Sequence, residues 1–154
     1  MAITLKTPAD IEKLRISGRM AAEVLAMIAE HVRPGVTTDE LDAICNRFIV
    51  GELKAIPANV GYMGFPKTVC TSVNHVVCHG IPGPKELKDG DIINIDVAII
   101  KDGYYGDTSR MYYAGTPGTE ARRLTETTYE AMIAGMREVR PGATLASRRR
   151  PTRR

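Results

Sequence analysis

Two aspartates in an otherwise apolar stretch, Asp96 and Asp107, are residues whose type and spacing suggest chemistry. They lie in "DIINIDVAIIKDGYYGDTS", residues 91–109, which has the composition of two strands joined by a turn. A carboxylate placed among isoleucines is costly unless a cation or hydrogen bonds compensate it. Each of these side chains therefore needs either water or a partner.

The dipeptide Asp102-Gly103 predicts how the two strands pair. It favours a two-residue type I′ turn, which needs positive φ at both central positions. In that register Asp96 faces Ser109, and Asp107 lies on the same face as a diagonal neighbour of Asp96, about 7–8 Å away at the backbone. A three-residue loop would break this arrangement, so the prediction depends on the turn.

Two converging carboxylates repel each other unless one is protonated or a cation lies between them. No basic residue of these strands is well placed to pair with both, because Lys101 is at the turn and Arg110 is expected on the opposite face. A divalent metal held by oxygen ligands is one interpretation. Exposure on a half-solvated sheet is a second, and acid/base chemistry is a third. The hairpin alone leaves all three open.

Two helices are predicted before this hairpin. The segment "TPAD", residues 7–10, has the pattern of a helix start, and helical apolar spacing continues to "PG" at residues 34–35. Thr37 and Glu40 form a capping-box pattern that starts the second helix. Both helices are expected to pack their apolar stripes into the core.

A strand, a turn and a last helix complete the predicted elements. Residues 67–81 are rich in valine and threonine and predict a strand, with a turn at residues 74–75. The last helix is expected at residues 119–139. "EVRPG" at residue 138 echoes "HVRPG" at residue 31. The echo indicates a two-fold repeat whose second copy begins near residue 117, unless it is a chance likeness of two helix junctions.

Composition places the chain among ordinary globular proteins. It has 154 residues, 44% hydrophobic and 25% charged, which suits one domain. The three cysteines form no CxxC motif, so we expect reduced thiols and a cytoplasmic protein rather than a disulfide framework or zinc ribbon. No signal peptide or membrane span is recognisable, and no membrane partner is expected.

Five arginines crowd into residues 148–154. Without these arginines the formal charge of +3 becomes −2, so binding to a nucleic acid would depend on this tail alone. We therefore expect no specific nucleic-acid partner. Such a run after ordinary sequence suggests a shifted reading frame or a truncated gene end. The alternative is a genuine basic tail that contacts the ribosome or RNA.

Several motifs occur together in a familiar order: "LKTPADIEKLRISGRMAAEVL", "GYMGFPKTVCTSVN", "HVVCHGIP" and "DGDIINIDVAIIKDGYYGDTSRMYYAG". Together they strongly resemble the bacterial type I methionine aminopeptidases, over about residues 2–144. The resemblance implies an α/β (α+β) "pita-bread" fold, here incomplete: the first pseudo-symmetric half plus the first helix of the second. Residues 1–146 would be the amino-terminal part of the catalytic domain, and residues 147–154 a disordered or frameshifted arginine-rich tail.

The resemblance also implies a function, the removal of initiator methionine from nascent polypeptides by water activated at two divalent ions, such as cobalt, manganese, iron or zinc. Asp96 would bind one ion and Asp107 would bridge both, while His79 would contact the substrate and assist the reaction. The methionine side-chain pocket would be lined by Tyr62, Phe65 and Cys70. Nascent polypeptide amino termini would be the substrate, and the ribosome is a candidate partner.

The sequence departs from this family in one large respect. Relatives take a histidine and two glutamates of the metal site from a second half, whereas the only histidines here are His31, His75 and His79. We therefore expect the isolated chain to bind metal weakly, to be nearly inactive, and to aggregate or dimerise. The alternative function is a non-enzymatic pita-bread-type fragment whose basic tail contacts the ribosome or RNA.

Overall fold

The computed structural model describes residues 4–144. The chain divides into two compact units, the first ending at Thr116 and the second beginning at Pro117. This division falls where the sequence echo places the start of a second copy. The arginine-rich tail, residues 147–154, lies outside the described residues, so the predictions for it stay predictions. No helix of the described residues is long and apolar enough to cross a membrane.

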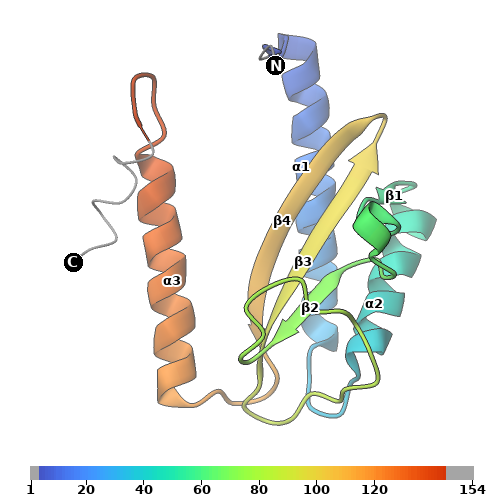
Figure 1. The fold of residues 1–154 in the computed structure, drawn as a ribbon, viewed down its shortest axis with the longest axis vertical. Helices are drawn as coiled ribbons and strands as arrows, with labels where there is room; N and C mark the ends of the chain where they lie inside the picture. Colours follow the sequence, from blue (N-terminus) through green and yellow to red (C-terminus); the bar gives the residue numbers. More distant parts are fainter. Residues whose placement is uncertain (1–3, 145–154) are drawn as a thin grey trace. The chain divides into compact units, whose positions relative to one another are not determined.

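The first unit is an antiparallel sheet with helices on one face (Figure 1). Its central strand is β3 (Ile92–Lys101), which pairs along one side with β4 (Tyr104–Tyr113). On its other side β3 pairs with the short β1 (Ile56–Pro57) at one end and with β2 (Cys70–Val73) nearer the other. This sheet carries all the residues that the sequence nominates for metal binding.

Both predicted helix starts are confirmed. α1 (Pro8–Ile28) and α2 (Thr38–Arg47) each begin with a capping box, in which a threonine hydroxyl and an acidic side chain bind each other's backbone N–H groups. The first α-helix ends before its predicted stop at residues 34–35. α1 passes into a 3-10 turn at Ala29–His31, and α2 into a π-helical turn at Phe48–Glu52.

The core lies between the helices and one face of the sheet. Every second residue of β3 is fully buried there, namely Ile93, Ile95, Val97 and Ile99. They join apolar side chains of α1 and α2, which include Val24, Ile28, Leu41 and Cys45. The alternate residues of β3 face away from the helices and, apart from the buried Ile92, are only half-buried, Asp96 among them.

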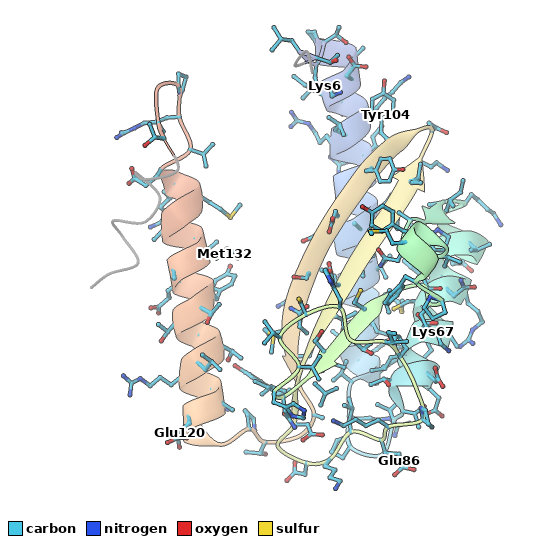
Figure 2. All side chains as sticks on the ribbon, viewed as in Figure 1. Lys6, Lys67, Glu86, Tyr104, Glu120 and Met132 are labelled. Carbon is cyan, nitrogen blue, oxygen red and sulfur yellow. The ribbon has the colours of Figure 1, made fainter. Side chains whose placement is uncertain are left out.

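The hairpin of β3 and β4 is fastened to α1. A Cβ atom at Gly106 would lie 2.2 Å from the Ser17 carbonyl oxygen, so only glycine allows the strand to lie this close to the helix. The Ser17 hydroxyl donates to the Tyr104 carbonyl (3.0 Å), and the Tyr104 hydroxyl donates to the Asp10 carboxylate. Figure 2 shows Tyr104 near the tip of the hairpin, beside the first turns of α1. These contacts fix the hairpin on the helix.

The predicted strand at residues 67–81 is only partly present, since β2 covers Cys70–Val73. The turn predicted at residues 74–75 is confirmed, with Asn74 at φ 53° and a bond from the Val76 amide to the Val73 carbonyl (3.1 Å). Beyond this turn the chain runs back beside β2 without a regular ladder. The prediction of strand structure for residues 76–81 is therefore wrong.

The second unit contains α3 (Thr119–Arg137), two residues shorter than the predicted helix. Its large apolar side chains are mostly exposed, and Figure 2 shows Met132 midway along the helix. Whether residues 1–146 form one domain stays a prediction.

Candidate metal centre

The turn between β3 and β4 sets the geometry of the aspartate pair. Asp102 and Gly103 both have positive φ, 51° and 82°, as a type I′ turn requires. Asp96 faces Ser109 in the resulting register, and Asp107 lies one diagonal step away on the same face. The predicted turn and register are confirmed, so the two carboxylates project from neighbouring strands on one side of the sheet.

The carboxylate pair lacks a basic partner. Asp96 is half-buried, and this burial together with the nearby Asp107 carboxylate raises its pKa, while His79 acts in the opposite direction. Within residues 4–144 neither aspartate forms an ion pair with lysine or arginine. Arg110 faces Ile95 on the other side of the sheet, as predicted. The arrangement therefore disfavours the ionised form of Asp96 and suits a cation brought from outside.

Cys70 adds a thiol next to this pair. It lies on β2 directly opposite Asp96 and is 6% exposed. Burial raises the pKa of Cys70 to about 11, and the neighbouring charges of Asp96 and Asp107 add to this shift. The thiol is therefore neutral near pH 7, which suits an apolar pocket wall better than a nucleophile or a thiolate ligand.

His79 is held in place by the glycine that follows it. The Thr71 amide donates to the Gly80 carbonyl (2.8 Å), and the Gly80 amide donates to the Ser72 hydroxyl (3.1 Å). A Cβ atom at Gly80 would lie 2.1 Å from the Thr71 carbonyl oxygen. His79 itself has φ 54°, so the chain turns at the histidine and Gly80 anchors it to β2.

Tyr62 and Phe65 lie in a tight loop with a 3-10 turn at Tyr62–Gly64. The Phe65 amide donates to the Tyr62 carbonyl (2.9 Å), and the Gly61 amide donates to the Phe65 carbonyl (2.8 Å). Tyr62 is 71% exposed, and Phe65 is half-buried. Both aromatic rings are thus available for contact, and their place in a methionine pocket stays a prediction.

The supports of His79 escaped the sequence analysis. Asn74 accepts a hydrogen bond from the Ile92 amide (3.1 Å) and donates to the Asp91 carboxylate (2.8 Å), which fixes the turn between β2 and His79. Ser72 and Gly80 complete the support. An asparagine at a predicted turn was a usable signal, because asparagine tolerates positive φ. The role of Ser72 needed the tertiary structure.

The donor set in this chain is partial. Among residues 4–144, no group of three or more histidine, cysteine, aspartate or glutamate side chains could hold a metal ion. The remaining residues, 1–3 and 145–154, contain none of these four types. The paired carboxylates match the oxygen donors that divalent ions prefer, so they fit one side of a metal site. They do not fit a complete one.

Comparison with known proteins identifies what this half-site resembles. The sequence profile of metallopeptidase family M24 matches residues 12–150. A methionine aminopeptidase of Escherichia coli K12 is 57% identical over 146 residues, which are 94% of this chain and 55% of that protein. The chain therefore spans about half the length of the curated relatives it matches.

Solved structures agree. The crystal structure of the Rickettsia prowazekii methionine aminopeptidase superposes with a TM-score of 0.91 at 54% identity, and covers 94% of this chain and 58% of that one. The Thermotoga maritima enzyme gives a TM-score of 0.87 at 32% identity, covering 92% and 57%. The predicted fold class, an incomplete pita-bread fold, is confirmed.

Proposed function

This chain belongs to metallopeptidase family M24, and from that premise we propose that it forms the amino-terminal half of an enzyme that removes the first methionine from nascent polypeptides. The observation that carries the proposal is the Asp96–Asp107 pair, which shares one sheet face with no basic partner among residues 4–144. The proposal places the reaction in the cytoplasm, with free polypeptide amino termini as the substrate.

Asp96 and Asp107 would hold the divalent ions, two in number by the family resemblance. When bound, such ions supply Lewis-acid activation of water and of the substrate carbonyl. Asp96 is fixed on the central strand, and Asp107 is fixed by the hairpin register. Both positions exist before any ion binds, so little rearrangement of this half-site is needed.

The remaining residues would bind the substrate. His79 would donate a hydrogen bond to the scissile amide or to the charge that develops on the carbonyl oxygen. The neutral thiol of Cys70 and the rings of Tyr62 and Phe65 would contact the methionine side chain, since a thioether suits soft, apolar surroundings. The high pKa of Cys70 keeps this wall uncharged.

The partial donor set limits what the chain can do alone. Two carboxylates leave most coordination positions to water, so we propose that the isolated chain binds divalent ions weakly and releases little methionine. Further donors have to come from outside these 154 residues.

A chimera tests the proposal. Residues 1–144 would be joined to the part of the E. coli relative that follows the matched region, and methionine release from Met-Ala-Ser would be measured with added Mn²⁺. We expect activity in the chimera and its loss on Asp107→Asn or His79→Ala. Asp102→Asn, at the exposed turn, is the matched control and should leave the activity unchanged. A folded, Mn²⁺-binding chimera that releases no methionine would refute the proposal.

A further inference from the structure

Thr68 is the residue at which three segments of the first unit meet. It is buried and lies two positions before Cys70. Its amide donates to the Asp42 carboxylate of α2 (2.8 Å), and its hydroxyl accepts from the side-chain amide of Asn46, one turn further along that helix (2.8 Å). Its carbonyl accepts from the side-chain amide of Asn59 (3.1 Å). Thr68 therefore ties together α2, the strand β2 that follows it, and the loop that begins at Asn59.

The side of this junction that faces α2 is held by several bonds. One carboxylate oxygen of Asp42 accepts from the amides of both Thr68 (2.8 Å) and Val69 (2.9 Å). Lys67, labelled in Figure 2, adds an ion pair with Asp39 of the same helix (2.6 Å). The loss of one further bond from α2 therefore leaves the start of β2 in place.

The loop side of the junction depends on one bond. The other bonds of this loop are local, since the Tyr62 amide donates to the Asn59 carbonyl (3.0 Å) and the Phe65 amide donates to the Tyr62 carbonyl (2.9 Å). They shape the turn but do not fix it relative to β2. Within residues 4–144, the bond from the Asn59 side chain to the Thr68 carbonyl is the only hydrogen bond that closes the loop of residues 59–68.

Side-chain packing adds little to this closure. Val60, Tyr62 and Met63 are 52%, 71% and 91% exposed, and Phe65 is half-buried. A segment with little buried apolar surface and few hydrogen bonds opens at a low cost in free energy. The bond from Asn59 therefore has a large share in holding the loop.

We propose that Asn59 is a positioning residue for methionine recognition. Its bond fixes the loop of Tyr62 and Phe65 beside the start of the strand that carries a third pocket residue, Cys70. The inference rests on the proposed function, in which these three side chains contact the methionine. A loop that already has its bound shape loses less conformational entropy when the substrate arrives. Asn59 thus strengthens substrate binding and acts through the loop rather than on the reacting atoms.

Kinetics of the chimera described above test the proposal. Asn59→Ala and its matched control Asn46→Ala each remove one side-chain hydrogen bond to Thr68, so both should lower the urea midpoint by similar amounts. Only Asn59→Ala opens the loop. It alone should raise the KM for Met-Ala-Ser roughly fivefold, the factor that corresponds to one hydrogen bond, with kcat unchanged within about twofold.

Nuclear magnetic resonance of the ¹⁵N-labelled 154-residue chain gives a readout that needs no activity. In Asn59→Ala the Tyr62 and Gly64 amides should lose order on the ps–ns timescale while the Thr71 amide of β2 keeps its order, and Asn46→Ala should leave all three unchanged.

Three results would overturn the proposal: unchanged loop order in the folded Asn59→Ala chain, an unchanged KM in the active Asn59→Ala chimera, or an equal rise in KM with Asn46→Ala. A wild-type chimera that folds and binds Mn²⁺ but releases no methionine refutes the proposed function instead. The role in methionine recognition falls with it, and the relaxation data still decide whether Asn59 holds the loop.

Discussion

Replacing Gly80 by alanine tests how the site holds His79. The added Cβ atom would lie 2.1 Å from the Thr71 carbonyl oxygen, 2.8 Å from the Thr71 carbonyl carbon and 3.1 Å from the Ser72 Cα. All three neighbours are backbone atoms of β2, so no side chain can swing aside. The segment that carries His79 has to move away from the strand by about 1 Å to restore ordinary contact distances.

That movement has an estimable cost. It weakens the Thr71–Gly80 backbone bond and the Gly80–Ser72 bond, and each such bond contributes about 1 kcal/mol. Crowding that is not fully relieved adds roughly 1–3 kcal/mol. We therefore expect Gly80→Ala to lower the free energy of unfolding by roughly 2–4 kcal/mol, a large share of the stability of a domain of this size.

Urea denaturation followed by circular dichroism measures this change, and the imidazole resonances of His79 report its displacement. Gly83→Ala is the matched control, because it lies in the same segment, has no neighbour within 4 Å of a new Cβ, and does not have positive φ. It should change the free energy of unfolding by less than about 1 kcal/mol. If the two variants are equally stable and show the same His79 resonances, Gly80 does not anchor the histidine.

Three further predictions concern the rest of the chain. Gly106→Ala should lower the free energy of unfolding by roughly 2–4 kcal/mol, because its Cβ would meet the backbone of α1. Gly18→Ala, with open space around a new Cβ in the same helix, should instead raise the free energy of unfolding by up to about 1 kcal/mol. Urea denaturation of both variants measures the two changes. Hydrogen bonds lower the pKa of Asp10 from 3.8 to about 2, so the ionised carboxylate stabilises the fold above about pH 4. The difference in urea midpoint between wild type and Asp10→Asn should close as the pH falls from 4 towards 2, and a difference that persists at pH 2 would contradict this. Met63 and Val77 are 91% and 92% exposed, so sedimentation at tens of micromolar should show dimers or larger species, and the Met63→Lys/Val77→Lys double variant should shift the chain towards monomer.

The features that the sequence predicted well are those that depend on a few neighbouring residues. Threonine followed three residues later by an acid identified both helix starts, since a capping box needs only these side chains and the local backbone. Asp102-Gly103 identified the turn, and the turn alone fixes the register of the strands on either side. The position of Asp107 relative to Asp96 followed from that register without any knowledge of the core.

The features that escaped prediction depend on contacts between distant residues. The valines after Asn74 favour a strand, yet the Gly80 amide binds a serine side chain rather than backbone, so no regular ladder forms. The π-helical turn after α2 was not predicted either. The two residues that follow it are held by a distant side chain, because Lys101 donates to the carbonyls of Leu53 and Lys54 from 48 and 47 residues away. Periodicity carries no information about such bonds.

The candidate metal centre contains both a feature set by neighbouring residues and a feature set by contacts between distant residues. The carboxylate pair depends on the hairpin register and therefore forms wherever the hairpin forms, with the ionised form of Asp96 disfavoured by burial and by Asp107. His79 depends instead on Gly80, Ser72 and the turn after β2, which are tertiary in origin. An isolated chain should therefore keep the geometry of its two carboxylates more robustly than the position of its histidine. For this half-site, loss of substrate contact by His79 should precede loss of cation binding as the fold is weakened.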